Sequence, residues 1–151
     1  MKITILFGTE SGNAQLVSED IADALRGDHT VDVHDMADFP VSDLDAGTLY
    51  LCVCSTYGDG ELPKSAFPFF RGLQESQTSL EGVRYAVFGL GDSDYIYSYS
   101  LGSEIIDKSL TAKGAQRIAE YGRHDAAAGE DPSPIGVEWA REVVAEFAAV
   151  A

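Results

Sequence analysis

Long apolar runs are missing from the sequence, and we expect neither a membrane span nor a signal peptide in it. None of its 151 residues belongs to an apolar run approaching the ~20 residues that a membrane-spanning helix needs. The start, Met1 to Gly8, carries one Lys and a short apolar run, which is typical of a first strand and not of a signal peptide. We therefore expect a cytoplasmic protein.

Basic residues are also scarce. Lys and Arg number 10 against 25 Asp and Glu, which leaves a formal charge of −15 with His neutral. Such a surface repels phosphate backbones and anionic membranes, so it disfavours nucleic acid and lipid as partners. It would steer a basic protein partner into docking. Because the acids are spread along the whole chain, solubility alone is the alternative explanation.

Cysteine is limited to Cys52 and Cys54, and no other ligand-type residues lie near them in the sequence. This disfavours a metal site or a redox pair. The two residues are two positions apart in an apolar, strand-like run, so their side chains would share one face of a sheet. We predict buried free thiols.

Strand and helix patterns alternate without repeats or linkers, which predicts a single α/β domain over residues 1–151. Nearly continuous apolar runs predict three central parallel strands: Ile3–Phe7, Leu49–Cys54 and Tyr85–Phe88. His29–His34 and Ala115–Tyr121 mix polar and apolar residues, which predicts two edge strands. With right-handed crossovers, five such strands fit a doubly wound sheet of order 2-1-3-4-5.

Helical patterns fill the gaps between the predicted strands. The clearest covers Ala14–Arg26, where Val17 and Ile21 belong to one apolar stripe. Three more helices and one turn or short helix are predicted, in chain order, over Met36–Gly47 (turn or short helix), Ser65–Gln74, Ser103–Lys113 and Ile135–Val150. Trp139 is expected to anchor the core.

A turn rich in glycine and hydroxyl groups, Gly8–Ala14, joins the first predicted strand to the first predicted helix. Its glycines let the backbone curl around an anion, Thr9 and Ser11 offer hydroxyls, and the helix presents unpaired N–H groups. The turn has no Lys or Arg, which disfavours a nucleotide-hydrolysing P-loop and favours a phosphate monoester held by neutral donors. An ordinary turn capped by Ser or Asn is the alternative.

Two further loops follow the other predicted central strands. Ser55–Pro63 and Gly89–Tyr95 each combine glycines with a tyrosine, Tyr57 or Tyr95. Ligands of open α/β sheets bind outside the carboxyl ends of the strands, so a flat ring with a phosphate tail would fit there, with the tyrosines stacking on it. Ordinary turn tyrosines are the alternative. A dinucleotide fingerprint is incomplete, because Asp94 occupies the position of its third glycine.

These three loops resemble, in order and separation, the phosphate loop and the two isoalloxazine loops of the flavodoxin family. Phe7–Ala14, Ser55–Gly60 and Phe88–Ser93 are similar to the FMN domains of cytochrome P450 reductase and sulfite reductase. The tail, with Glu130-Asp131-Pro132 and Glu138-Trp139, resembles small MioC-type flavodoxins. The insertion of long-chain flavodoxins is absent. The resemblance therefore implies a short-chain, free-standing member with the flavodoxin-like fold, helices on both faces of the sheet, and FMN as cofactor.

The resemblance also implies a set of cofactor-binding residues. The phosphate would be held by Thr9, Ser11, Gly12, Asn13 and Ala14, with help from the Thr56 hydroxyl. Tyr57 and Tyr95 would cover the ring faces, with Tyr97 in reserve because the residues after Tyr95 depart from the reductase-like pattern. The full predicted set is Thr9, Glu10, Ser11, Gly12, Asn13, Ala14, Ser55, Thr56, Tyr57, Gly58, Asp59, Gly60, Gly89, Leu90, Gly91, Asp92, Tyr95 and Tyr97.

Gly58 and the acids of the ring loops are expected to tune the potentials. In the family, the peptide at the position of Gly58 turns its carbonyl toward the flavin in the semiquinone, and glycine tolerates that turn. Acids in the ring loops, including Asp59 and Asp92, would disfavour an anionic hydroquinone and lower the potential of the second electron. Solvated acids with little effect are the alternative for these side chains.

The implied function is an electron carrier that shuttles single electrons through the FMN semiquinone and hydroquinone. The expected donor is a basic-faced NADPH-dependent flavodoxin or ferredoxin reductase, and the carrier is expected to be a monomer without metal or catalytic residues. An FMN-dependent NAD(P)H:quinone reductase is the alternative. A CheY-like signalling domain is disfavoured, because Gly8-Thr9 and Ser55-Thr56 replace its acids. His124 and Asp125, near the end of the fifth predicted strand, are expected in a loop and are given no role; a place at the border of the site is the alternative.

Overall fold

A parallel sheet forms the centre of the computed structural model, which describes residues 1–56, 61–91, 101–125, 129 and 131–150. Its strands run in the order β2-β1-β3-β4-β5, and β6 also pairs with β4. The strands are β1 (Lys2–Gly8), β2 (Thr30–Asp35), β3 (Leu49–Ser55), β4 (Arg84–Gly91), β5 (Gln116–Arg117) and β6 (Gly122–Asp125). The predicted order 2-1-3-4-5 is confirmed.

The fifth position in the sheet differs from the single strand predicted over Ala115–Tyr121. Two short segments, β5 and β6, pair with β4 instead. From Tyr85 to Phe88, β4 advances three residues, whereas the paired segment advances five, from Arg117 to Gly122. Two residues are therefore in excess, and the backbone must leave the ladder to accommodate them.

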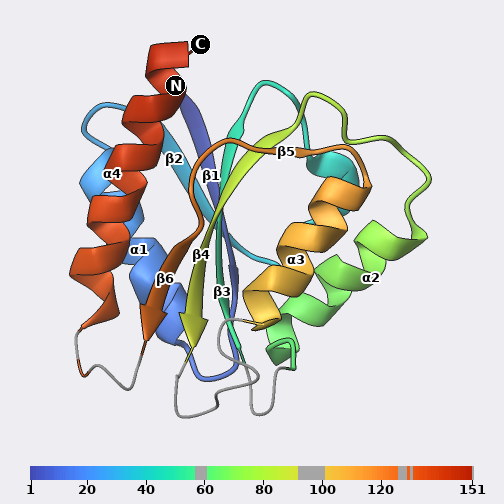
Figure 1. Cartoon of the computed structure of the whole chain (residues 1–151), viewed down its shortest axis with the longest axis horizontal. Coiled ribbons are helices and arrows are strands. Elements are labelled where there is room, and N and C mark those ends of the chain that lie inside the picture. Colours follow the sequence, from blue (N-terminus) through green and yellow to red (C-terminus); the bar gives the residue numbers. More distant parts are fainter. Residues whose placement is uncertain (57–60, 92–100, 126–128, 130, 151) are drawn as a thin grey trace.

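Helices cover both faces of this sheet (Figure 1). One face carries α1 (Asn13–Leu25) and α4 (Pro132–Val150), and the other carries α2 (Phe67–Glu75) and α3 (Leu101–Ala112). Two short 3-10 helices, η1 (Val41–Asp43) and η2 (Lys64–Ala66), lie in the connections. The predicted helices are present with ends shifted by at most three residues, and the Met36–Gly47 segment holds only η1.

The start of α4 shows why one observed helix end differs from the predicted one. The prediction began this helix at Ile135, but it begins at Pro132. The Asp131 carboxylate accepts a hydrogen bond from the Ser133 N–H at 3.0 Å, and Pro132 follows this cap directly. An acidic cap followed by proline in the first turn is a common helix start, because proline lacks the N–H that the turn would leave unpaired.

Two apolar layers fill the space between the sheet and its helices. Alternate residues of β1 divide between them: Ile3 and Ile5 face α1 and α4, whereas Leu6 faces α2 and α3. Trp139 belongs to the first layer, 5.3 Å from Phe88 between ring centroids, and this confirms its predicted place in the core.

Cys52 and Cys54 lie together in the second layer, where both are free and fully buried. The prediction of buried thiols on one face of the sheet is confirmed. Burial raises the pKa of Cys52 to about 12, and it raises the pKa of Cys54 further. Both groups are therefore kept as neutral thiols that pack as small apolar side chains.

Candidate functional site

The carboxyl ends of β1 and β3 lie side by side where the winding of the sheet reverses. From β1 the chain crosses to β2 on one side and then returns past β1 to β3 on the other. This switch point leaves the connection after β1 and the connection after β3 on either side of a crevice, the usual ligand position in such sheets. Figure 1 shows this edge at the bottom, where the arrows of β4 and β6 end.

The connection after β1 is held in place from outside. The Thr9 N–H donates to Oγ of Ser65 at 2.8 Å, and the Ser65 N–H donates back to the Thr9 carbonyl at 3.3 Å. The Glu10 carboxylate accepts from the Lys64 N–H at 2.6 Å. Three hydrogen bonds thus fasten the loop to η2, more than fifty residues further along the chain. All three bonds are made within the chain itself, so none of them depends on a ligand.

A fourth hydrogen bond closes the loop on itself where it enters α1. The Gly12 N–H donates to Oγ1 of Thr9 at 2.8 Å, and Gly12 has a φ of 99°, in the left-handed region. A residue with a Cβ adopts this conformation at a cost, so glycine suits the position. Space is no constraint there, because a Cβ on Gly12 would meet no described atom within 4 Å.

The N-terminus of α1 has no side-chain cap, contrary to the alternative of an ordinary capped turn. The first bond inside the helix runs from the Leu16 N–H to the Gly12 carbonyl, at 3.1 Å. The N–H groups of Asn13, Ala14 and Gln15 consequently have no acceptor among the residues that the structure describes. The first turn also carries no acidic side chain. Free N–H groups and the positive end of the helix dipole together suit a phosphate group.

The connection after β3 is tied to α3 and to β4. The Thr56 N–H donates to the Leu90 carbonyl at 2.9 Å, and Oγ1 of Thr56 accepts from the Gly102 N–H at 2.9 Å. The hydroxyl hydrogen of Thr56 therefore stays available for another acceptor. A Cβ on Gly102 would stand 2.6 Å from the Ser55 carbonyl oxygen, so only glycine lets α3 approach β3 this closely.

The end of β4 is packed just as tightly. A Cβ on Gly89 would stand 3.2 Å from both Cβ of Ser103 and Cε1 of Tyr121. The Tyr121 hydroxyl donates to Oγ of the fully buried Ser103. Gly89 thus lets α3 and the segment before β6 meet over the strand, which fixes the point where the chain leaves β4.

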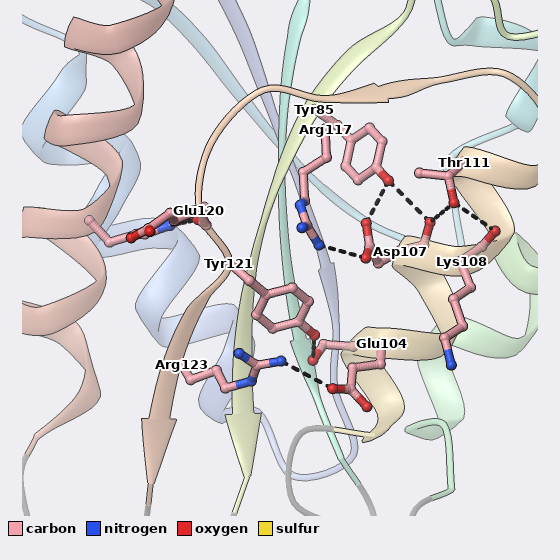
Figure 2. A network of polar contacts seen from close by, with 11 residues as sticks. Tyr85, Glu104, Asp107, Lys108, Thr111, Arg117, Glu120, Tyr121 and Arg123 are labelled. Carbon is pink, nitrogen blue, oxygen red and sulfur yellow. Dashed lines mark hydrogen bonds and ion pairs between the residues drawn. The ribbon is translucent and has the colours of Figure 1, made fainter.

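Figure 2 shows the polar network that holds α3 to this part of the sheet. Arg123 stacks over the ring of Tyr121, with 4.0 Å from its guanidinium carbon to the ring centroid, and pairs with Glu104 at 3.0 Å. Further along α3, Asp107 accepts from the Tyr85 hydroxyl at 2.6 Å and pairs with Arg117 at 2.8 Å. Burial is the main cause that raises the pKa of Tyr85 and of Tyr121 well above the usual value for tyrosine. The network holds α3 against β4 and the segment that follows it.

A family model for flavodoxin matches residues 5–136 of the chain. The chain belongs to the flavodoxin family. As a flavodoxin, it is an FMN-binding electron-transfer protein, which confirms the predicted fold, cofactor and general function. The MioC homologue of Haemophilus influenzae is 36% identical over 141 residues, which cover 92% of this chain and 94% of that protein.

Similar segments also occur inside much longer reductases. NADPH–cytochrome P450 reductase of Sus scrofa is 35% identical over 82% of this chain, and the mitochondrial NADP(+) pyruvate dehydrogenase of Euglena gracilis is 37% identical over 82%. The chain spans only 19% and 7% of these two proteins. Among solved structures, a flavodoxin mutant from Pseudomonas aeruginosa superposes with a TM-score of 0.84 at 26% identity, covering 97% of this chain and 98% of that one.

The structure brings together one part of the predicted set of cofactor residues. Thr9 to Ala14 form the loop and helix start after β1, Ser55 ends β3 and Thr56 follows it, and Gly89 to Gly91 end β4. The remaining predicted residues lie outside the part of the chain that the structure describes: Tyr57, Gly58, Asp59, Gly60, Asp92, Tyr95 and Tyr97. The Glu10 carboxylate accepts a hydrogen bond from the backbone N–H of Lys64. Glu10 would therefore contact a ligand through its own backbone N–H.

Sequence reasoning missed Ser65 and Gly102, which position the two connections described above. Ser65 gives no local signal, because its partner Thr9 is distant in the sequence. His124 and Asp125 were expected in a loop, but they lie in β6, paired in register with Leu90 and Gly91. The prediction was wrong because strand pairing with β4 continues beyond the predicted end of the fifth strand.

The described residues contain no group of three or more His, Cys, Asp or Glu side chains placed to hold a metal ion. Within the same residues, no helix combines the length and apolar character needed to cross a membrane.

Proposed function

We propose that this flavodoxin holds the FMN phosphate at the start of α1 and passes single electrons between a separate reductase and a redox acceptor. The observation that carries the proposal is the uncapped N-terminus of α1 within a loop that is already fixed by hydrogen bonds to η2. Bound there, FMN supplies redox chemistry in one-electron steps.

The residues after β1 fit a phosphate monoester with two negative charges. Free N–H groups of Asn13 and Ala14 and the exposed hydroxyl of Ser11 are neutral donors, and the loop offers no cation. Thr56 can donate its hydroxyl hydrogen from the opposite side, since its oxygen already accepts from Gly102. Neutral donors hold the phosphate without adding positive charge beside the redox centre.

Residues outside the described part complete the proposed site. Tyr57 and either Tyr95 or Tyr97 would cover the faces of the ring, and Gly58 would let its peptide turn toward the ring edge. Asp59 and Asp92 would oppose further negative charge on the ring. Support for these roles comes from the family membership of the chain and from the positions of the flanking ends of β3 and β4.

Charge and relatives support an electron carrier with a basic-faced, NADPH-dependent donor. The net charge of −15 favours encounter with a basic partner surface. Sulfite reductase [NADPH] flavoprotein of Bacillus subtilis, 36% identical over 78% of this chain, and the Sus scrofa P450 reductase both carry NADPH in their names. A direct NAD(P)H:quinone reductase is the second candidate, and the same relatives are the observation that favours it.

The decisive experiment begins with the colour of the purified protein. We expect a yellow protein that releases FMN on denaturation and consumes NADPH only when a separate reductase is added. A colourless protein that fails to bind FMN would reject the proposed cofactor site. Steady NADPH oxidation with a quinone and no added reductase would reject the carrier role while leaving the cofactor site intact.

A further inference from the structure

A second hollow lies away from the proposed cofactor site, on the α2 and α3 face of β1 and β2. It has a volume of about 290 Å³ and is lined by Lys2 and Thr4 of β1, Asp32 and His34 of β2, and the rings of Phe39 and Tyr50, among others. We call it the β1–β2 groove. Thr4 precedes Gly8 by four residues, so the groove begins ~13 Å along the strand from the phosphate loop. Its size reaches the lower end of small-molecule sites.

The strands present polar side chains to this groove, although a doubly wound sheet is normally apolar on both faces. Thr4 shares a face with Leu6, which belongs to the apolar layer under α2 and α3. In register with Thr4 stand Asp32 on one side and Tyr50 on the other. In this row the apolar layer continues only through Tyr50, and Thr4 and Asp32 add no apolar side chain to it.

Thr4 is the residue that points to a ligand. Its side chain is 5% exposed and lines the groove, yet its hydroxyl makes no hydrogen bond to any residue that the structure describes. Valine would fill the same volume without a polar atom. The Thr4 oxygen is not among the described buried atoms that lack a partner, so it opens into the groove and takes its hydrogen bond from whatever fills the groove, water or a ligand.

The charges and rings around Thr4 define the chemistry of that molecule. Three carboxylates line the groove, from Asp32, Asp43 and Asp45, against the single ammonium of Lys2, which forms no ion pair with a described residue. The wall that carries two of these acids is fixed, because the Asp45 N–H donates to the Tyr50 hydroxyl at 2.9 Å. The rings of Phe39 and Tyr50 meet edge to face, with 6.2 Å between centroids.

We propose that the β1–β2 groove binds a small organic cation, a guanidinium or primary ammonium on a short alkyl chain. The carboxylates accept its N–H donors, the Thr4 hydroxyl accepts one more, and the rings cover its alkyl chain or its charged group. The cation comes either from a free amine or from an Arg or Lys side chain of another protein. The site does not depend on FMN, since none of its lining residues belongs to the three connections at the carboxyl ends of the strands.

The test is a titration of the 15N-labelled, flavin-loaded protein with agmatine at about 0.15 M salt, followed by amide chemical shifts. We expect saturable shifts around Thr4, Asp32 and Tyr50. Thr4→Val and Asp32→Asn should each weaken binding by roughly fivefold, the scale of one lost hydrogen bond for Thr4 and of one exposed charged contact for Asp32. Thr4→Ser keeps the hydroxyl and should bind like the natural sequence. Asp20→Asn removes the same charge from the exposed face of α1 and is the matched control.

A second titration uses a capped Gly-Arg-Gly peptide and shows whether the bound cation is a free amine or a protein side chain. Equal binding of agmatine and peptide supports a site for a free cation, whereas binding of the peptide alone supports a protein-borne arginine in the same groove. Shifts that do not saturate by about 10 mM, or that spread over the acidic surface and weaken equally in Asp20→Asn, would overturn the proposal. Retained binding in both Thr4→Val and Asp32→Asn would overturn it as well.

Discussion

The backbone N–H of Gly12 donates to Oγ1 of Thr9 at 2.8 Å, and this bond sets the shape of the loop from which α1 begins. The same Thr9 is held from outside through its N–H and carbonyl by Ser65. Thr9 is therefore the residue through which η2, the loop and the first turn of α1 are connected. Its substitution tests the proposed phosphate site without removing any proposed phosphate donor from the helix.

Thr9→Val should weaken FMN binding by roughly fivefold, because a lost hydrogen bond of about 1 kcal/mol leaves the Gly12 N–H unpaired and the loop less ordered. Thr9→Ser keeps the oxygen and is the matched control. FMN fluorescence quenching in a titration of the flavin-free protein gives the dissociation constants. An unchanged constant in Thr9→Val would contradict the role of this bond.

Gly12→Ala should lower the free energy of unfolding of the flavin-free protein by about 1–2 kcal/mol, because alanine must adopt the left-handed φ of 99°. Gly27→Ala is the matched control, since a Cβ there also meets nothing within 4 Å and Gly27 is not among the positive-φ glycines. This control should be neutral or slightly stabilising. Urea unfolding measures both, and equal losses would show that backbone conformation is not the cause.

Two fully buried serines should respond in opposite directions to the same change. Oγ of Ser18 has no partner among the described residues, so Ser18→Ala removes an unsatisfied group and should raise the free energy of unfolding by up to about 1 kcal/mol. Ser103 accepts from Tyr121, so Ser103→Ala should lower it by about 1–3 kcal/mol. A loss of similar size in both variants would argue that packing, and not hydrogen bonding, decides the outcome.

Stability should fall on the alkaline side from about pH 9. Burial raises the pKa of Cys52 from 9.0 to about 12 and that of Cys54 further, so the unfolded chain releases these protons before the folded one. The stabilisation is complete below pH 9 and is lost as the pH rises toward the folded pKa, with a slope of up to ~1.4 kcal/mol per pH unit for each thiol.

Cys54→Ala removes one of these thiols and isolates its contribution. The free energy of unfolding, measured in urea at pH 8, 9 and 10, should fall less steeply with pH in this variant than in the natural sequence. Identical slopes would contradict the assignment. In the folded protein at pH 8, both thiols should also resist a disulfide reagent until urea unfolds the chain.

Local sequence patterns predicted what depends on local forces. The apolar run Ile3–Phe7 predicted a central strand because both of its faces meet helices, and the glycines of Gly8–Ala14 predicted a turn that leaves the helix start open. Features that depend on the register between two strands could not be predicted from the sequence. The two excess residues between Arg117 and Gly122 exist only relative to the paired stretch of β4, and no periodicity within the segment reveals them.

The residues of the candidate site likewise separate into those that local sequence predicts and those that depend on the folded topology. Thr9 and Gly12 could be chosen from their residue types, because hydroxyls and glycine at a helix start have a direct chemical meaning. The partners that position them could not, since Lys64 and Ser65 become neighbours of the loop only through the folded topology. The carboxylate of Glu10 likewise has its binding partner in η2, which the sequence alone does not indicate.

The open start of α1 makes the stability of the flavin-free protein depend on the buffer that contains it. Three N–H groups there have only water as acceptor, and any tetrahedral dianion that reaches them completes the helix. Inorganic phosphate and sulfate should therefore raise the unfolding temperature of the flavin-free protein by mass action and compete with FMN for its tail. Affinities measured in phosphate buffer would then report an exchange of one anion for another.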